Sequence, residues 1–518
     1  MRLTARPNIR SRRKWSRETG AAPDVMLSAL AAAPIAAVLV LMLLGGWSAA
    51  GAGSVGAGLA IVLALAAFDP APGAARMLMG AAAEAGFTTA TILWIIWPAL
   101  CIHALQTGTG RIAMLQAALE RLSGDNVART LLIGWFFALF MEGAAGFGAP
   151  VALAAPLLVS LGLPPVRALT IALIGHAAGV SFGAVGTPIL PQIAATDLSG
   201  RALAVVPALL HGALGWVLML ALLREMGAWR WRLGLVAALA FFVPYVALAL
   251  LFGPELPTLG GALIGGVGFA LFLRIRGGAA SSGGGATSPG DLAMAFAPYL
   301  TLVVLIVVAR LPGLREVLAN ADLSWGLWER FSGTFAPLYH PGTLLAVSFL
   351  GGWALQRPAF AEVRGAIGRG TRQVLPVVPA LLVMLVLARI LVHAGMIDQL
   401  ARDAAKAFSG IWPPIAPLVG MLGTFVTGSA TTSNILFTEL QARIASELNL
   451  SLLLVLGAQT FGAAVGNIVC PHNVVAGCAT IGLVGREGEI LRRTLPVGLL
   501  YGLLGGGLVW LLSVVGLF

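Results

Sequence analysis

Six ionisable side chains interrupt long runs of apolar residues in this sequence. They are Glu142, His176, Arg389, His393, Glu439 and His472. Burying a charge in hydrocarbon is costly, so intramembrane ionisable residues usually belong to a pathway for protons, ions or polar solutes. These residue types therefore predict proton exchange and the binding of an anion, rather than the making or breaking of covalent bonds.

Glu142 is a carboxylate at a predicted helix break, within the run Phe140–Pro150. A carboxylate at such a position gains and loses a proton as its solvation changes. We predict that Glu142 is a proton-coupling residue and that His472 is a second one. The alternative for Glu142 is a structural role, in which it bridges the tips of broken helices through hydrogen bonds. The alternative for His176 and His472 is a histidine bonded to backbone carbonyls.

Glycines and small polar residues gather around the predicted breaks. Broken helices expose unpaired backbone groups, and matched breaks point to the binding site of a transporter. Half-helix N-termini also attract anions. Predicted substrate contacts from these segments come from Gly143, Gly146, Gly148, Ser429, Thr431, Thr432, Ser433, Asn434 and Asn467. The alternative for isolated glycines is close packing of helices.

Arg389 lies deep in the apolar run 374–397. Its distance from the Asp398 end is roughly 12 Å of helix. A guanidinium presents a planar fork that fits a carboxylate, and His393 lies one turn further on the same face. We predict that both side chains contact the substrate. The alternatives for Arg389 are a water-filled vestibule or a permanent acidic partner.

The elements that must position these residues are two similar segments, Phe140–Pro191 and Phe425–Val475. Each begins with Phe, two residues and Gly, and each reaches a second Gly-rich break before a proline. Within them, Phe182–Gly186 (FGAVG) and Phe461–Gly466 (FGAAVG) are near copies. The sequence is therefore predicted to be internally duplicated, with a broken-helix or re-entrant hairpin in each repeat.

The composition indicates that these elements lie in a lipid bilayer. Of 518 residues, 58% are hydrophobic and 10% are charged, whereas soluble domains carry about 25% charged residues. The apolar runs are continuous rather than alternating, so they predict helices. We predict an all-α polytopic membrane protein with about 12 to 14 transmembrane helices in two repeats.

Four regions follow from this pattern. Residues 1–24 form a basic tail, which the positive-inside rule predicts to be cytoplasmic. Residues 25–276 form a first membrane half with its hairpin near 140–191, and residues 277–290 form a Gly/Ser-rich linker. Residues 291–518 form a second half with its hairpin near 425–475. Between its spans, Leu311–His340 is predicted to lie along the membrane surface.

Several other functions are excluded by context. The net charge of +11 comes from basic residues that cluster at membrane borders, which argues against nucleic-acid binding. Gly51–Gly56 fits GxGxxG but follows an apolar helix, and Gly179–Gly183 fits GxSxG without a strand-to-helix elbow. No P-loop, HExxH motif or His/Cys cluster occurs. We therefore predict no enzyme activity, no cofactor and no metal.

Four motifs resemble the L-lactate permease family. They are Phe140–Ala152 (FMEGAAGFGAPVA), Gly253–Pro257 (GPELP), Phe425–Asn434 (FVTGSATTSN) and Cys478–Glu487 (CATIGLVGRE). The resemblance extends over most of the chain. It implies proton-coupled import of small 2-hydroxymonocarboxylates, such as lactate or glycolate, across a bacterial inner membrane.

Three departures from the family pattern affect the substrate more than the mechanism. Ala430 stands where the family commonly has Asp or Asn, and Gly175–Val180 (GHAAGV) replaces an Asn-Thr-Ala-Pro-Val run. Arg389 and His393 stand where aromatic residues are usual. The alternative is therefore an uncoupled or exchanging carrier of another organic anion. A membrane-embedded enzyme or a channel fits the paired breaks less well, and the oligomeric state is left open.

Overall fold

The computed structural model describes residues 25–68, 73–146, 148–196, 198–276, 288–311 and 313–517. The predicted basic tail and most of the predicted linker lie outside these residues. The described chain is almost entirely helical, which confirms the prediction of an all-α polytopic membrane protein. Among the described residues, 11 helices are long and apolar enough to cross a bilayer, or up to 13 if each bent pair is one span.

The first half contains α-helices, one π-helix (η2) and two 3₁₀-helices (η3 and η4). In chain order they are α1 (Val25–Leu43), α2 (Ala49–Ala67), α3 (Ala74–Gly108), α4 (Arg111–Arg121), α5 (Asn126–Leu131), η2 (Leu132–Phe137), α6 (Ala138–Ala144), α7 (Ala149–Ser160), α8 (Pro165–Gly175), η3 (Ala177–Phe182), α9 (Gly183–Gly186), η4 (Thr187–Ile189), α10 (Leu190–Ala195), α11 (Gly200–Leu214), α12 (Trp216–Met226), α13 (Trp231–Phe252) and α14 (Pro257–Ile275).

The second half continues with helices and one antiparallel β-hairpin. Its elements are α15 (Pro289–Ala295), α16 (Ala297–Ala309), α17 (Leu314–Asn320), β1 (Leu323–Leu327), β2 (Phe331–Phe335), α18 (Pro341–Gln356), α19 (Phe360–Val374), α20 (Val377–His393), α21 (Met396–Phe408), η5 (Ser409–Ile411), α22 (Trp412–Thr427), α23 (Ala430–Glu447), α24 (Leu452–Val469), α25 (Pro471–Thr480) and α26 (Glu487–Val515).

Serine residues begin several of these helices. In α2, α11 and α24 the side chains of Ser48, Ser199 and Ser451 each accept a hydrogen bond from a backbone N–H in the first turn. Such caps satisfy donors that the helix itself leaves unpaired. They separate the apolar runs into helices of defined length, which is what a bilayer requires.

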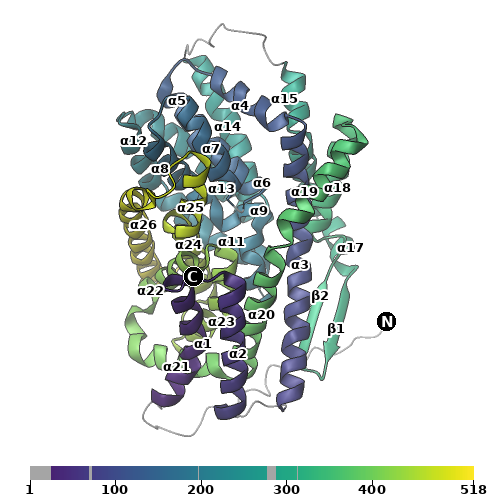
Figure 1. Cartoon of the computed structure of the whole chain (residues 1–518), viewed down its shortest axis with the longest axis vertical. Coiled ribbons are helices and arrows are strands. Elements are labelled where there is room, and N and C mark those ends of the chain that lie inside the picture. Colours follow the sequence, from purple (N-terminus) through teal and green to yellow (C-terminus); the bar gives the residue numbers. More distant parts are fainter. Residues whose placement is uncertain are drawn as a thin grey trace.

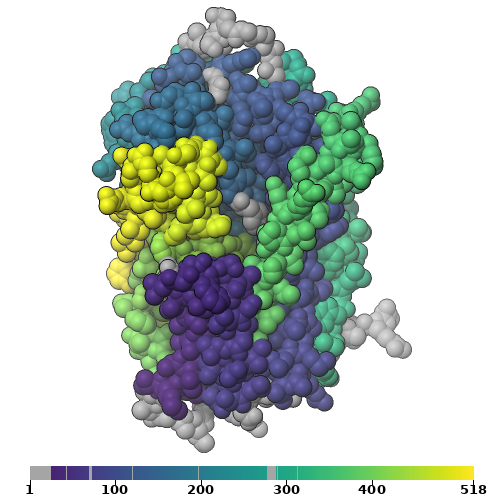
Figure 2. All heavy atoms as spheres, in the orientation of Figure 1, coloured from purple at the N-terminus to yellow at the C-terminus, as the bar shows by residue number. Residues whose placement is uncertain are grey.

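The two halves are packed into one another rather than side by side. The helix α3 runs along most of the length of the molecule, and α18, α19 and α20 of the second half lie against it (Figure 1). In turn, α24 packs on η3 and α11 of the first half. On the face shown in Figure 2, α25 (yellow), α20 (green) and α1 with α2 (purple) stand around a narrow recess.

The segment predicted to lie at the interface contains α17 and the β-hairpin. In the hairpin, Leu323 pairs with Phe335 and Leu327 pairs with Phe331. The Phe331 side chain is fully buried and occupies the space above Gly80 of α3, where a Cβ would lie 2.4 Å from the ring. The hairpin is therefore anchored to the membrane helices.

Candidate functional site

The first break separates α6 from α7. The backbone of Gly146 and Gly148 takes positive φ angles, 57° and 83°, which glycine adopts without steric strain. The chain leaves α6 at Ala144 and begins α7 at Ala149. This confirms a broken helix at the predicted position in the first half.

Glu142 lies in the last turn of α6 and is 6% exposed. Its Oε1 occupies the space beside two glycines: a Cβ at Gly183 would lie 2.0 Å from it, and a Cβ at Gly146 would lie 3.6 Å away. Only glycine at position 183 leaves room for the carboxylate. The two breaks of the first half therefore meet around Glu142, whereas Gly143 packs on the backbone of Leu259 in α14.

The span from α8 to α10 is broken over several residues. Ala184 and Val185 have left-handed φ angles of 41° and 56°, which are unfavourable for residues with a Cβ and are held only by the surrounding structure. The backbone acceptors freed here find partners: Tyr245 Oη donates to the carbonyl of Ala178 at 2.9 Å, and Thr258 Oγ1 donates to that of Gly179 at 2.7 Å.

The second half repeats this arrangement. Gly428, with a φ of 75°, ends α22, and Ser429 caps α23 by accepting from the Thr432 N–H at 3.2 Å. Thr431 is 5% and Thr432 is 7% exposed. A second break at Cys470 separates α24 from α25. The order of a broken pair followed by a broken span is thus the same in both halves.

Ser433 and Asn434 face the protein interior. Ser433 Oγ donates to the carbonyl of Gly420 at 2.8 Å, and Asn434 Nδ2 donates to the carbonyl of Pro188 at 2.7 Å. Gln459 Nε2 of α24 donates to Ser433 Oγ at 3.2 Å. Gln459 Oε1 accepts a hydrogen bond from Gln441 Nε2 of α23 at 3.0 Å. Sequence reasoning did not assign these two glutamines to the site, although Gln459 interrupts the predominantly apolar helix α24.

The remaining predicted residues of the second half lie at the break between α24 and α25. Asn467 Oδ1 is 3.0 Å from His176 Nε2 and accepts from Asn473 Nδ2 at 2.8 Å. His472 is exposed and lies against the backbone of Gly428, where a Cβ would be 3.1 Å from the His472 Cβ. Asn467 and His472 are therefore both next to other broken segments.

A small apolar cluster marks where the breaks of the two halves meet. It consists of Val180 of η3, Ala430 at the start of α23, and Ala463 and Ala464 of α24. Ala430 is 4% exposed in this cluster. The breaks of both repeats therefore converge on one region.

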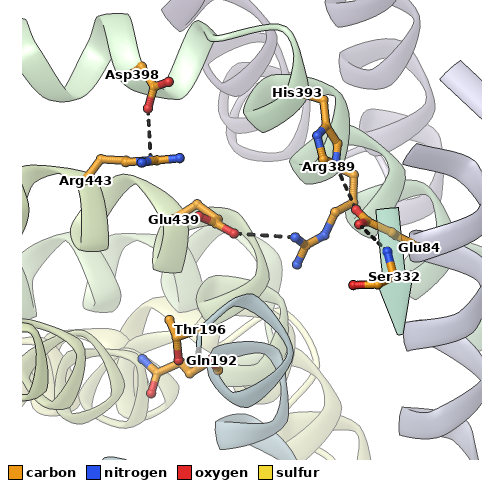
Figure 3. Close-up of polar contacts among 9 residues, drawn as sticks. All are labelled: Glu84, Gln192, Thr196, Ser332, Arg389, His393, Asp398, Glu439 and Arg443. Atoms are coloured by element: carbon orange, nitrogen blue, oxygen red, sulfur yellow. Dashed lines mark hydrogen bonds and ion pairs between the residues drawn. The ribbon is translucent and has the colours of Figure 1, made fainter. Parts of the chain in front are cut away.

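Arg389 and His393 are both paired with acidic residues (Figure 3). Arg389 is 3.4 Å from Glu439 of α23, and His393 Nε2 is 2.8 Å from Glu84 of α3. The second oxygen of Glu84 accepts from the Ser332 N–H of the β-hairpin at 3.3 Å. Glu439 follows Ala430 by nine residues, so this ion pair lies about 13 Å along α23 from the break.

A buried hydroxyl–imidazole chain also escaped sequence reasoning. Ser181, the serine of the rejected GxSxG pattern, lies 2.9 Å from Nε2 of His211 in α11. The His211 Nδ1 is 2.8 Å from the Tyr501 hydroxyl of α26. All three side chains are fully buried. These hydrogen bonds therefore link η3, α11 and α26, and the three side chains are not accessible to a substrate in this conformation. Within the described part of the chain, no group of three or more His, Cys, Asp or Glu residues could hold a metal ion.

Two solved structures share this fold. Neisseria gonorrhoeae MtrF, from a class of antimetabolite efflux pumps, aligns with a TM-score of 0.51 and 14% identity over 90% of this chain and 95% of that one. The Alcanivorax borkumensis YdaH transporter aligns with a TM-score of 0.50 and 18% identity over 85% and 88%. The helical fold and the paired breaks define a multi-pass, all-α membrane protein.

The family is given by the sequence comparisons. The model for L-lactate permease matches residues 28–516, and the chain belongs to the L-lactate permease family. The glycolate permease GlcA of Escherichia coli K12 is 30% identical over 473 residues, 79% of this chain and 82% of that protein. The L-lactate permease of Bacillus subtilis is 28% identical over 540 residues, 91% and 93%.

Proposed function

We propose that this protein imports lactate, glycolate or a closely related 2-hydroxymonocarboxylate by proton symport across the bacterial inner membrane. Membership of the L-lactate permease family is the observation that carries the substrate class. The proton coupling is supported by Glu142, a buried carboxylate enclosed by two glycine breaks. No cofactor takes part in this proposal, because transport driven by a gradient needs only the protein, the substrate and protons.

The substrate anion is proposed to bind where the breaks converge. Each half-helix that starts there presents unpaired N–H groups and the positive end of its dipole, which favour a carboxylate. The donors of Ser433 and Asn434 are already engaged with the protein. Ser429, Thr431, Thr432 and the backbone of Gly146 and Gly148 are therefore the preferred contacts, with Ser433 and Asn434 as residues that hold them in place.

Glu142 is proposed to carry the transported proton. A carboxylate moved between a buried and a water-filled setting changes its affinity for a proton. Binding of the anion nearby favours the protonated form, because two negative charges in a low-dielectric site repel each other. Proton and substrate would therefore cross together, and His472 at the mouth of the second break is the proposed relay.

Reconstituted protein in liposomes tests both parts of this proposal. With an inward proton gradient, radiolabelled L-lactate or glycolate should accumulate, and a protonophore should abolish the accumulation. Protein-free liposomes are the control for leakage. Absence of transport of any 2-hydroxy acid by folded protein would reject the substrate class, and protonophore-resistant accumulation would reject the coupling.

Glu142→Gln separates coupling from binding, because it preserves the shape of the side chain and removes its titration. Gradient-driven uptake should fall by at least about tenfold, while exchange of internal for external substrate should continue. The exposed Glu447 of α23 supplies the matched control Glu447→Gln, which should transport normally. A Glu142→Gln protein that concentrates substrate like the parent would make Glu142 structural.

The second candidate, an uncoupled or exchanging anion carrier, is favoured by one observation. Ala430 places a methyl group in the apolar cluster where the breaks of the two halves meet, at a position where the resemblance to the family implies a polar or acidic residue. The same assay decides between the two candidates. Rapid counterflow without any response to the proton gradient would support the exchanger.

A further inference from the structure

His176 joins the broken spans of the two halves. It follows Gly175, whose missing side chain lets the backbone approach η2: a Cβ there would lie 1.7 Å from the carbonyl oxygen of Gly134. The imidazole is 2% exposed. Its Nδ1 is 2.7 Å from the carbonyl oxygen of Ala172, and its Nε2 is 3.0 Å from Asn467 Oδ1 in α24.

The partners of this imidazole determine where its hydrogens lie. A carbonyl oxygen can only accept, so Nδ1 must carry a hydrogen. Asn473 Nδ2 is 2.8 Å from Asn467 Oδ1 and, more weakly, 3.5 Å from the main-chain oxygen of Asn467. Because that main-chain oxygen also only accepts, Asn473 presents its amino group and Asn467 presents its oxygen. The same oxygen faces His176, so Nε2 must carry a hydrogen as well.

We propose that His176 is a proton-binding site, held as an imidazolium between Ala172 and Asn467 in this conformation. Loss of the proton would leave the lone pair of Nε2 facing the lone pairs of Asn467 Oδ1. Relief requires the amides of Asn467 and Asn473 to turn, so that an amino group faces the ring. The charge state of His176 is thereby coupled to the break between α24 and α25.

His176 differs in this respect from the other fully buried histidine of the core. The partners of His211 are the hydroxyls of Ser181 and Tyr501, and a hydroxyl can donate or accept. Because Ser181 Oγ also donates to the Thr460 carbonyl at 3.4 Å, the neutral tautomer of His211 with its hydrogen on Nε2 satisfies every contact without an extra proton. Burial opposes a charged ring at both positions, but only at His176 do both contacts favour it.

Other titratable groups surround the site without bonding to the ring. Besides His211, the groups on the elements packed around α8 and η3 are Glu142 of α6, Arg201 of α11, Arg224 and Glu225 of α12, Tyr245 of α13, Arg274 of α14, Cys470, His472 and Cys478 around α25, and Glu487, Glu489, Arg492, Arg493 and Tyr501 of α26. Arg493 pairs with Glu225 at 2.8 Å. Arg167 of α8 lies nine residues from His176, about 13 Å along the helix, and its Nη1 would be 3.3 Å from a Cβ at Gly227 after α12. Glu142 approaches Gly179 and Gly183 next to the site.

A direct test is ¹⁵N NMR of the full-length protein in liposomes, with its histidines labelled and His176→Gln used for assignment. Between about pH 5 and about pH 9, the His176 signals should change from two protonated nitrogens to one protonated and one bare nitrogen. The His211 signals should remain those of a neutral ring. A His176 ring that stays neutral over the whole range would overturn the proposal.

Two substitutions of the partner test the contact itself. Asn467→Asp places a carboxylate opposite Nε2 and should move the His176 titration upward by about one pH unit or more, whereas Asn467→Leu removes the acceptor and should move it downward. An unchanged midpoint in both variants would show that this contact does not hold the proton. If either variant fails to fold, the titration of the parent protein still decides the proposal.

The proposal that His176 binds a proton does not depend on the proposed symport. Only a role of His176 in coupling that proton to transport rests on the proposed function. If His176 carries a transported proton, His176→Gln should keep substrate counterflow and lose the pH dependence of gradient-driven uptake. If the parent protein transports no 2-hydroxy acid but His176 titrates, the proposed function fails and the proton site stands. If the parent protein transports a 2-hydroxy acid and His176 stays neutral, the proposed function stands and the proton site is rejected.

Discussion

Arg389 illustrates how much the role of one residue depends on its partner. Its guanidinium has a planar fork suited to a substrate carboxylate, yet the structure places it 3.4 Å from Glu439, with both side chains largely buried. The Nε of Arg389 has no partner among the described residues. One face of the guanidinium is therefore committed to Glu439, and a substrate would have to compete with it or join it.

The ion pair makes a clear prediction for the variants of Arg389. Arg389→Gln leaves the Glu439 carboxylate buried and unpaired, so the free energy of unfolding should fall by about 3–5 kcal/mol. The double variant Arg389→Gln with Glu439→Gln removes both charges and should recover most of that loss. Thermal unfolding in detergent measures the effect.

Substrate affinity of the same proteins then decides whether Arg389 is also a ligand. The double variant should bind substrate normally if Arg389 only neutralises Glu439. If Arg389 holds the substrate, the double variant should be stable but unable to bind, and Arg389→Lys should retain weak uptake. Stability that is not recovered in the double variant would contradict the pairing argument.

At the scale of elements, the two broken spans of the first half depend on glycines, one for its backbone conformation and one for the space that it leaves to Glu142. The φ of Gly146 requires a left-handed conformation, so its role is conformational. Gly183 is different: its φ is −63°, which any residue can adopt. The need for glycine there is steric, because the Glu142 carboxylate occupies the space of a Cβ.

Gly183→Ala should therefore displace Glu142 without straining the backbone. We expect lower stability, by about 1–3 kcal/mol as for overpacked cores, and loss of gradient-driven uptake. Gly58→Ala in α2 is the matched control, because no atom lies within 4 Å of its Cβ position; it should be neutral or slightly stabilising. Normal uptake by Gly183→Ala would mean that Glu142 can function from another position.

At the scale of the whole molecule, the repeats are joined by polar contacts in an apolar interior. Asn434 of α23 donates to the Pro188 carbonyl in the first half, and His176 reaches Asn467 in the second. Such bonds are directional, and leaving one partner unpaired is costly. They fix the relative position of the breaks, which apolar packing alone would leave less well defined.

Asn434→Ala should weaken this connection. It removes the donor to the Pro188 carbonyl and one of the two acceptors of Gln459 Nε2, which keeps Ser433 Oγ. The free energy of unfolding should fall by about 1–3 kcal/mol. Uptake should fall too, because the contact that fixes α23 relative to the broken span of the first half is lost. Thr494→Val is the control, since the buried Thr494 hydroxyl has no hydrogen-bond partner among the described residues; its removal should be neutral. Equal stability of both variants would argue against the role of Asn434.

The sequence by itself determined that the protein lies in a lipid bilayer, that it is helical, which family it belongs to and where its helices break. These features depend on local signals: continuous apolar runs, and glycine or proline at the residues where a helix must end. Gly146, Gly148 and Gly428 do adopt positive φ angles at the predicted breaks, because that requirement belongs to the residue itself.

Only the tertiary structure decided which polar groups are free and which are already paired. Arg389 with Glu439, His393 with Glu84, Asn434 with Pro188 and Ser181 with His211 are contacts between residues 30 to 309 positions apart. No local pattern encodes such a partner, because the pairing depends on which helices pack together and in which rotation. For the same reason the β-hairpin that holds Glu84 was not predicted: its exposed strands carry little periodic signal, and its anchor, Phe331, is buried only because α3 has a glycine opposite it.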